Sequence, residues 1–163
     1  MKHRVPALAL VFLAVLINSC GQSSNLPNDV ATVLRVVDGD TVILDLHGST
    51  ETVRLIGINT PETVHPSKPV ECFGPQASAY LHALLKPDTQ VRIRRDIEAR
   101  DRYNRLLVYI YLLDDTFVND ELLRQGFART LRIEPNTTFA TQFASTETGA
   151  RANRVGLWQA CQR

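Results

Sequence analysis

Three short segments of this chain carry residue types that could act together on a phosphate ester. They are Asp38–Thr41, Arg54–Glu62 and Asp101–Arg105. The segments contain carboxylates that suit a hard cation, two arginines that suit a phosphate group, and a glutamate able to activate water. A metal-dependent phosphodiester hydrolase needs this combination. Position 59 is occupied by an amide, where a second carboxylate ligand would be the natural residue.

Each segment has a simpler explanation when it is taken alone. Asp38 and Asp40 flank a glycine at the end of a predicted strand, a pattern more typical of a hairpin turn than of a calcium site. Arg54 either pairs with an acid at the rim of its strand or holds a phosphate through two hydrogen bonds. Glu62 follows a proline, and a glutamate in such a loop is usually solvated. The metal-dependent interpretation therefore depends on the three segments occurring together.

The N-terminal residues are predicted to direct export. A basic start precedes the uncharged, apolar stretch 5–17, which is too short to span a bilayer comfortably but suits the core of a signal peptide. Residues 16–21 resemble the lipobox of bacterial lipoproteins, in which Cys20 is acylated. We therefore expect a lipoprotein signal peptide over 1–19, a lipidated flexible tether over 20–30 and a membrane-anchored domain over 31–163, facing the periplasm or the cell exterior. The alternative is cleavage by ordinary signal peptidase, which leaves Cys20 free.

The charge balance restricts how such a protein attracts an anion. Cleavage before Cys20 removes two basic residues, so 18 basic and 17 acidic residues become 16 and 17, a net charge of about −1. Affinity for phosphate must then come from local clusters. One candidate lies around Arg105, where Asn104 tolerates a left-handed turn. The nearby arginines form either a solvated face or a groove that follows a phosphate backbone: Arg92, Arg94, Arg95, Arg100 and Arg102.

Cysteine usage predicts one covalent cross-link. If Cys20 carries lipid, Cys72 and Cys161 remain as a pair, and in an exported chain a disulfide between them is the expected state. Two buried free thiols are the alternative. Nothing in the sequence indicates an oligomer, so we expect a monomer.

The pattern of apolar residues predicts the elements that position these groups. Val/Leu-rich or alternating stretches predict strands at 32–37, 41–46, 52–58, 89–95 and 106–112, the first three joined by tight turns as an antiparallel meander. Helices are expected at 75–86, from a cap at Asn119 to Gly126, and from a cap at Asn136 to about 153. This order predicts a mainly β fold of the OB type, a five-stranded antiparallel barrel with three α-helices. An open α+β sheet is the alternative.

Taken in this order, the segments resemble the thermonuclease (staphylococcal-nuclease-like) family. The similarity runs from about Val33 to Trp158, nearly the whole mature chain. It is carried by Val37–Val42, Arg54–Leu55, Thr60–Thr63, His65–Pro66, Gly74–Ala79, Tyr103–Arg105, Tyr109–Tyr111 and Val118–Gly126. The resemblance implies an OB barrel and Ca²⁺-dependent endonuclease cleavage of DNA and RNA, with products that end in 3′-phosphate.

The resemblance also assigns ligands to the metal. Asp40 matches a direct Ca²⁺ ligand, Thr60 matches a ligand through its carbonyl, and Asn59 stands at the second side-chain ligand position, with Asp38 behind them. The family has an aspartate where this chain has Asn59, so one formal negative charge is lost. Charge count tunes calcium affinity, and we therefore expect weaker binding. The alternative is a non-catalytic nucleic-acid-binding OB module whose metal site has decayed.

The same resemblance assigns the catalytic groups. Glu62 matches the residue that acts as general base or orients water, and Arg54 and Arg105 match the pair that grips the scissile phosphate. All three are retained, which argues against a decayed site. Residues 131–135 lack the two tyrosines that family members place before the third helix, so stacking on the nucleotide is expected to differ.

Overall fold

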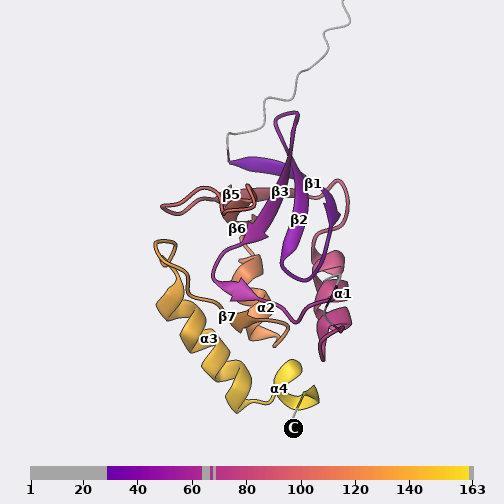
Figure 1. The fold of residues 1–163 in the computed structure, drawn as a ribbon, viewed down its shortest axis with the longest axis vertical. Coiled ribbons are helices and arrows are strands. Elements are labelled where there is room, and N and C mark those ends of the chain that lie inside the picture. The colour runs from indigo at the N-terminus through magenta and orange to yellow at the C-terminus, as the bar shows by residue number, and fades with distance from the viewer. Residues whose placement is uncertain (1–28, 64–66, 68, 162–163) are drawn as a thin grey trace, which may run out of the picture.

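The computed structural model describes residues 29–63, 67 and 69–161. Five strands make up its largest sheet: β1 (Val30–Val36), β2 (Thr41–Leu46), β3 (Ser49–Leu55), β5 (Gln90–Arg94) and β6 (Leu106–Leu112). They close into a barrel in the order β1-β2-β3-β6-β5, which confirms the predicted OB-type barrel (Figure 1). The predicted signal peptide, Cys20 and residues 21–28 lie outside the described residues, as does the quoted pair 65–66.

The barrel is mixed, whereas we predicted an antiparallel one. The first three strands form the antiparallel meander that the tight turns indicate, and β5 is antiparallel to both β1 and β6. Strands β3 and β6 are parallel, with Val53 opposite Leu106 and Leu55 opposite Val108. The reason is topological: in a closed ring with an odd number of strands, the directions cannot alternate all the way round. At least one parallel pair is required.

The predicted third strand, 52–58, is divided in two. β3 ends at Leu55, and after a turn the chain forms β4 (Ile58–Asn59), which pairs with β7 (Arg129–Thr130) in a separate two-stranded sheet. Gly57 makes this turn with a φ of +79°. A side chain there would lie 2.5 Å from the ring of Phe143, so the turn needs glycine for its conformation and for the space.

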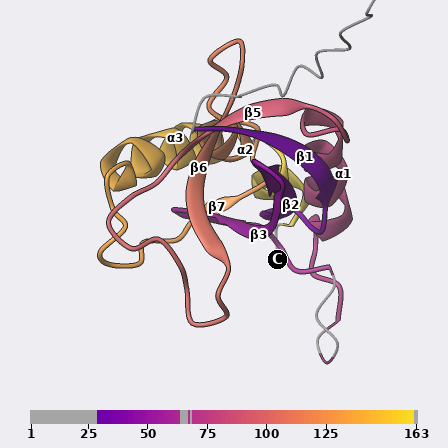
Figure 2. The same ribbon diagram turned by 90° about the horizontal axis from the view of Figure 1, so that it is seen from above.

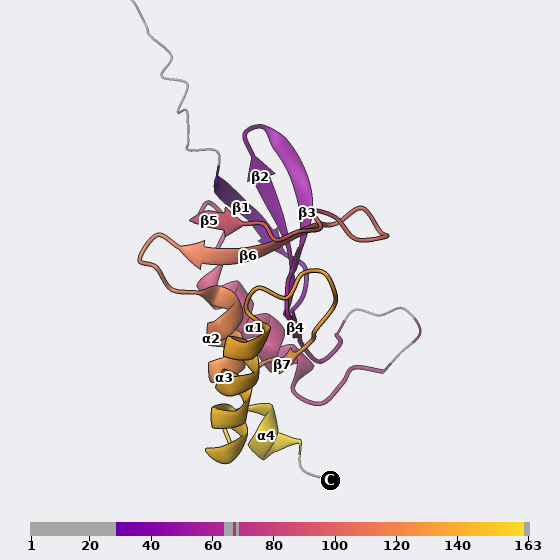
Figure 3. The same cartoon turned by 90° about the vertical axis from the view of Figure 1, so that its left-hand side faces the viewer.

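Four helices gather at one end of the barrel (Figures 1 and 3). They are α1 (Gly74–Leu84), α2 (Val118–Arg124), α3 (Ala140–Ala152) and the short α4 (Leu157–Ala160), which was not predicted. In the view of Figure 2, α1 and α3 lie on opposite sides of the strands. Among the described residues, no helix has the length and apolar character needed to cross a membrane.

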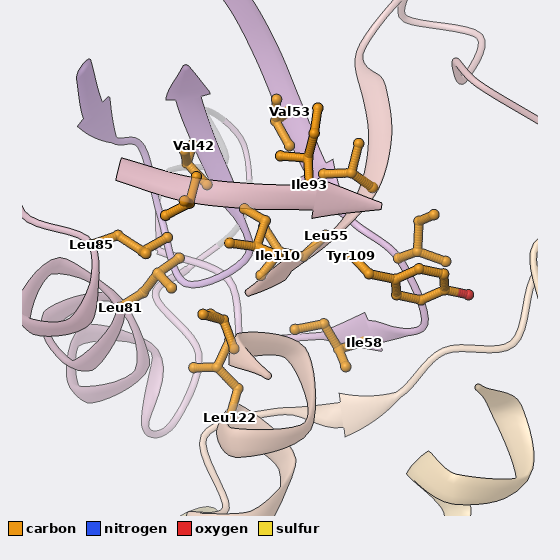
Figure 4. Packing of buried hydrophobic residues seen from close by; sticks show 14 of the residues in the cluster. Val42, Val53, Leu55, Ile58, Leu81, Leu85, Ile93, Tyr109, Ile110 and Leu122 are labelled. Atoms are coloured by element: carbon orange, nitrogen blue, oxygen red, sulfur yellow. The ribbon is translucent and has the colours of Figure 1, made fainter. Parts of the chain in front are cut away.

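The apolar stripe of α1 closes one side of the core. Leu81 and Leu85 have no exposed surface and point toward the barrel strands, as Leu122 does from α2 (Figure 4). Val53 and Ile110, from the parallel pair of strands, are likewise fully buried. Burial of each such side chain contributes about 1.5–3 kcal/mol, so the helices hold the barrel closed at this end.

Neither of the two asparagines that we predicted as helix caps acts as one. Asn119 lies inside α2, where its buried Oδ1 accepts a hydrogen bond from the amide of Ile110 (3.0 Å) and its Nδ2 donates to the carbonyl of Ile56 (2.9 Å). Asn136 precedes α3 by four residues and exchanges hydrogen bonds with the backbone of Glu98 (2.7 and 2.8 Å). The amide of Asn119 therefore satisfies two buried backbone groups, and the amide of Asn136 joins the loop before α3 to the backbone at Glu98.

Cys72 and Cys161 form a disulfide. The bond joins the segment just before α1 to the residue that follows α4. It therefore ties the C-terminal end of the described chain to the loop that carries Glu62.

Candidate active site

A cleft of about 670 Å³ brings the three sequence segments together. Its walls come from the turn before β2, the end of β3 with β4, and the loops around residues 60–62, 98–105 and 131–136. Every residue predicted for metal binding or catalysis lines it: Asp38, Asp40, Arg54, Asn59, Thr60, Glu62 and Arg105. The predicted lipidation site Cys20 lies outside the described residues.

Asp40 is the buried centre of the cleft. One carboxylate oxygen, Oδ2, accepts hydrogen bonds from the amide (2.9 Å) and hydroxyl (3.2 Å) of Thr60 and forms an ion pair with Nη2 of Arg54 (3.0 Å). The other oxygen accepts from the hydroxyl of Thr41 (3.2 Å). The strand register explains these contacts, because Thr41 pairs with Arg54 and the amide of Leu55 donates to the carbonyl of Asp40.

Gly39 lets this turn approach Thr60. A Cβ at position 39 would lie 2.6 Å from Oγ1 of Thr60, closer than real Cβ contacts. The glycine in Asp-Gly-Asp is therefore needed for close packing of the turn against the loop that follows β4. The contact keeps Thr60, itself only 6% exposed, beside Asp40.

Arg54 links the two predicted side-chain ligands. Its Nη2 contacts Asp40 and donates to Oδ1 of Asn59 (3.2 Å), and its Nη1 donates to the carbonyl of Leu55 (2.6 Å). Burial lowers the pKa of Arg54, whereas the charge of Asp40 raises it; a guanidinium stays protonated under all physiological conditions. A positively charged nitrogen thus lies between two oxygens from different segments.

The oxygens of this cluster suit a hard divalent cation. They comprise the carboxylate of Asp40, the amide oxygen of Asn59 and the carbonyl of Thr60, with Asp38 behind them, and Ca²⁺ prefers such ligands. A cationic nitrogen already sits between the first two. No group of three or more His, Cys, Asp or Glu side chains able to hold a metal occurs within the described residues.

Asp38 lies behind Asp40 and stabilises the turn. Its Oδ1 accepts a hydrogen bond from the backbone amide of Asp40 (3.1 Å). Burial, followed by the charge of Asp40, raises the pKa of Asp38. The two carboxylates repel each other, and a bound cation would relieve that repulsion.

Arg105 is held at the cleft by Asp101, a contact that we did not predict. Nε and Nη2 of Arg105 both lie 2.8 Å from Oδ2 of Asp101. Burial alone would raise the pKa of Asp101, but hydrogen bonds and charge from Arg105 outweigh it and lower the pKa. As expected, Asn104 adopts the left-handed conformation, with φ of 64°. An acid four residues before an arginine was the available signal for this pair.

Glu62 lies in the loop that leaves the cleft. Its Oε1 accepts a hydrogen bond from the amide of Thr63 (2.8 Å), and its backbone amide donates to Oε2 of Glu71 (3.1 Å). Glu71 therefore fixes the backbone at Glu62 from nine residues away. No sequence pattern indicated that role for Glu71.

The basic run around Arg105 is divided by the fold. Arg92 pairs with Asp115, Arg100 with Glu51, and Arg94 lies over the ring of Phe139, whereas only Arg102 of the five neighbouring arginines lines the cleft. The run is therefore no continuous phosphate groove. The cleft itself has three arginines and seven acids, a net charge of −4, the acids being Asp38, Asp40, Glu62, Glu71, Glu98, Asp101 and Glu134.

Comparison with known proteins supports the resemblance seen in the sequence. The profile of the family described as Staphylococcal nuclease homologue matches residues 52–160. A thermonuclease of Staphylococcus intermedius is 37% identical over 158 residues, which cover 94% of this chain and 93% of the relative. For a thermonuclease of Staphylococcus hyicus the identity is 35% over 135 residues, or 83% and 79% of the two chains.

A longer relative also matches most of this chain. The SPbeta prophage-derived endonuclease YokF of Bacillus subtilis (strain 168) is 36% identical over 129 residues, which are 78% of this chain and 43% of the relative. Because the family profile covers most of the chain and the two thermonucleases match along most of their own length, this protein belongs to the staphylococcal nuclease homologue family.

Proposed function

We propose that this protein is a calcium-dependent endonuclease that hydrolyses phosphodiester bonds of DNA and RNA to products with 3′-phosphate. Relatives named thermonuclease and endonuclease support the nuclease activity. The observation that carries the assignment is the cluster of Asp40, Arg54, Asn59 and Thr60 in one cleft with Arg105. It combines oxygen ligands for a cation with two guanidiniums for a phosphate.

The charge of the cleft favours a metal-dependent reaction. A phosphodiester brings a negative charge into a cleft that already has a net charge of −4. Two of its three arginines, Arg54 and Arg105, are partly neutralised by Asp40 and Asp101. A divalent cation held by Asp40, Asn59 and Thr60 would offset this repulsion. When bound, calcium would supply charge that polarises the phosphate and lowers the pKa of water.

The protein side chains have distinct roles in the proposed reaction. Arg54 and Arg105 hold the non-bridging oxygens and stabilise the charge that develops on them in the transition state. Glu62 accepts a proton from the attacking water. The water oxygen bonds to phosphorus as the bond from phosphorus to the 5′ oxygen breaks, and that oxygen leaves as an alcohol after taking a proton from solvent. The phosphate then stays on the 3′ side.

A cleavage assay across a calcium titration tests this function. Protein expressed from the full chain is incubated with single-stranded DNA, with a chelator as control. We expect cleavage only with calcium, and product 3′ ends that a polymerase extends only after phosphatase treatment. If binding persists but no cleavage occurs at tens of millimolar calcium, the chain is instead the non-catalytic binding module.

Two substitutions sharpen the assay. Arg105→Ala should lower the rate on the order of a hundredfold, whereas Arg35→Ala, an exposed arginine outside the cleft, should leave it unchanged. Asn59→Asp should lower the calcium concentration for half-maximal rate by about tenfold, because charge count tunes calcium affinity. An unchanged calcium requirement would mean that residue 59 is not at the metal.

We also propose that the enzyme is exported and anchored through lipid on Cys20, as a monomer. The basic start, the short apolar stretch and the small residue before Cys20 support this assignment. Labelling of cells with a radioactive fatty acid should mark the wild-type protein and not Cys20→Ala. Labelling of both proteins would exclude Cys20 as the acylated residue, and sedimentation of the solubilised protein tests the monomer.

A further inference from the structure

Asn59 makes two hydrogen bonds of opposite polarity at the centre of the cleft. Its Oδ1 accepts from Nη2 of Arg54, and its Nδ2 donates to the carbonyl oxygen of Thr60, each at 3.2 Å. The amide orientation is determined by these partners. Exchange of the two ends would set an NH₂ group against the guanidinium and an oxygen against the carbonyl.

A carboxylate at the same position would satisfy only one of these partners. It would still accept from Arg54, but it has no donor for the carbonyl of Thr60. Two oxygen atoms would then face each other about 3.2 Å apart unless a cation lay nearby. The NH₂ group of Asn59 thus presents a partly positive hydrogen to the carbonyl that is also a proposed calcium ligand.

We propose that Asn59 is a positioning residue that holds the Arg54 guanidinium and the Thr60 carbonyl in place when no cation is bound. For the carbonyl oxygen, the partly positive hydrogen of this NH₂ group takes the part that a calcium ion would play. Calcium must then compete with both hydrogen bonds of Asn59 for the same oxygens. The chain gains a site that is ordered without metal and gives up part of the free energy of calcium binding. This second consequence rests on the proposed calcium site, whereas the first does not.

Thermal unfolding, measured with chelator and with saturating calcium, separates the two consequences: order of the site without metal and weaker binding of calcium. The full chain is compared as wild type, Asn59→Asp and Asn59→Ala. Asn153→Asp is the matched control, an exposed asparagine beyond the end of α3 and outside the cleft. In chelator we expect Asn59→Asp to unfold roughly 3–5 °C below wild type, from loss of one hydrogen bond and a new repulsion.

With saturating calcium, only one variant should no longer unfold below the wild-type temperature. Asn59→Asp should then unfold at or above the wild-type temperature, whereas Asn59→Ala stays below it and Asn153→Asp shows the same offset in both conditions. If calcium raises the unfolding temperature of wild type but leaves both Asn59 variants equally far below it with and without calcium, the role of Asn59 is merely structural and the proposal is overturned. An Asn59→Asp protein as stable as wild type in chelator would also overturn it.

The same experiment distinguishes failure of the proposed calcium binding from failure of the positioning role of Asn59. If calcium shifts the unfolding temperature of no variant while Asn59→Asp remains destabilised in chelator, the proposed calcium use is refuted. The role of Asn59 in holding Arg54 and Thr60 would then stand.

Discussion

Replacement of Asn119 tests how the barrel holds the turn beside the candidate active site. This residue is fully buried, and it bridges the carbonyl of Ile56, in the turn between β3 and β4, to the amide of Ile110 on β6. Arg54 precedes that turn and Asn59 follows it. Asn119→Ala removes both hydrogen bonds and leaves two buried backbone groups without a partner.

The expected loss of stability follows from those two groups. A buried donor or acceptor left unsatisfied costs about 1–3 kcal/mol, so Asn119→Ala should lower the free energy of unfolding by about 2–5 kcal/mol. Asn119→Asp should cost a similar amount or more. It keeps the acceptor for Ile110 but has no donor for Ile56, and it buries a charge beside a carbonyl.

Guanidinium unfolding followed by far-UV circular dichroism measures this loss. We expect the midpoint to fall by about 1 M, whereas Asn153→Ala, an exposed control, should change it little. The competing explanation is that Asn119 caps a helix. Aspartate caps a helix as well as asparagine does. An Asn119→Asp protein with wild-type stability would therefore refute the bridging role of Asn119 and favour the capping role.

Three further outcomes are expected for stability. Reduction of the Cys72–Cys161 disulfide, whose cysteines are 89 residues apart, should lower the free energy of unfolding by about 4–5 kcal/mol in the chain-entropy description, measured with and without reductant. Gly57→Ala should cost about 2–4 kcal/mol in a denaturant titration, because the new Cβ meets Phe143 at 2.5 Å where φ is positive. Asp96→Ala should cost about 1–2 kcal/mol at pH 7, since Asp96 accepts hydrogen bonds from a core tyrosine and from the loop before α3. Burial opposes these hydrogen bonds, but they outweigh it and lower the pKa of Asp96, so the difference should vanish as the pH falls below about 4; a constant difference down to pH 2 would contradict the assignment.

The barrel strands were predictable because they are rich in Val, Leu and Ile and, in β2, because buried and less buried side chains alternate. In β2, for example, Val42 and Leu44 face the core while Ile43 between them is less buried, and such a pattern leaves one register. The paired strands β4 and β7 have two residues each and offer no period to detect. They form because Gly57 turns the chain and the amide of Leu131 donates to its carbonyl, a tertiary effect.

The misassigned asparagines show where local rules fail. A polar residue before a helix is normally a cap, because helix amides lack partners there. Asn119 and Asn136 instead satisfy backbone groups of segments 63 and 38 residues away in the sequence. A single sequence does not show which distant amide or carbonyl lacks a partner, so the same residue type fits both roles.

Residue types identified the candidate ligands, but their partners depended on the fold. Asp40 and Arg54 were predicted to take part separately, and strand pairing sets them 3.0 Å apart. Asp101 and Glu71, which hold Arg105 and the backbone at Glu62, had no assigned role. Supporting residues of this kind are ordinary surface acids until the loops that carry them are placed.

The parallel pair that the sequence did not reveal is also the pair that brings the two arginines together. Arg54 lies opposite Leu107 in the register of β3 and β6. Because side chains alternate along a strand, Arg105, two residues before Leu107, lies on the same face as Arg54, while Val53 and Leu106 face the core. A slip of one residue in this register would turn Arg105 toward the interior. The register of this parallel pair therefore determines whether the two guanidiniums lie on one face, as the proposed grip on a single phosphate requires.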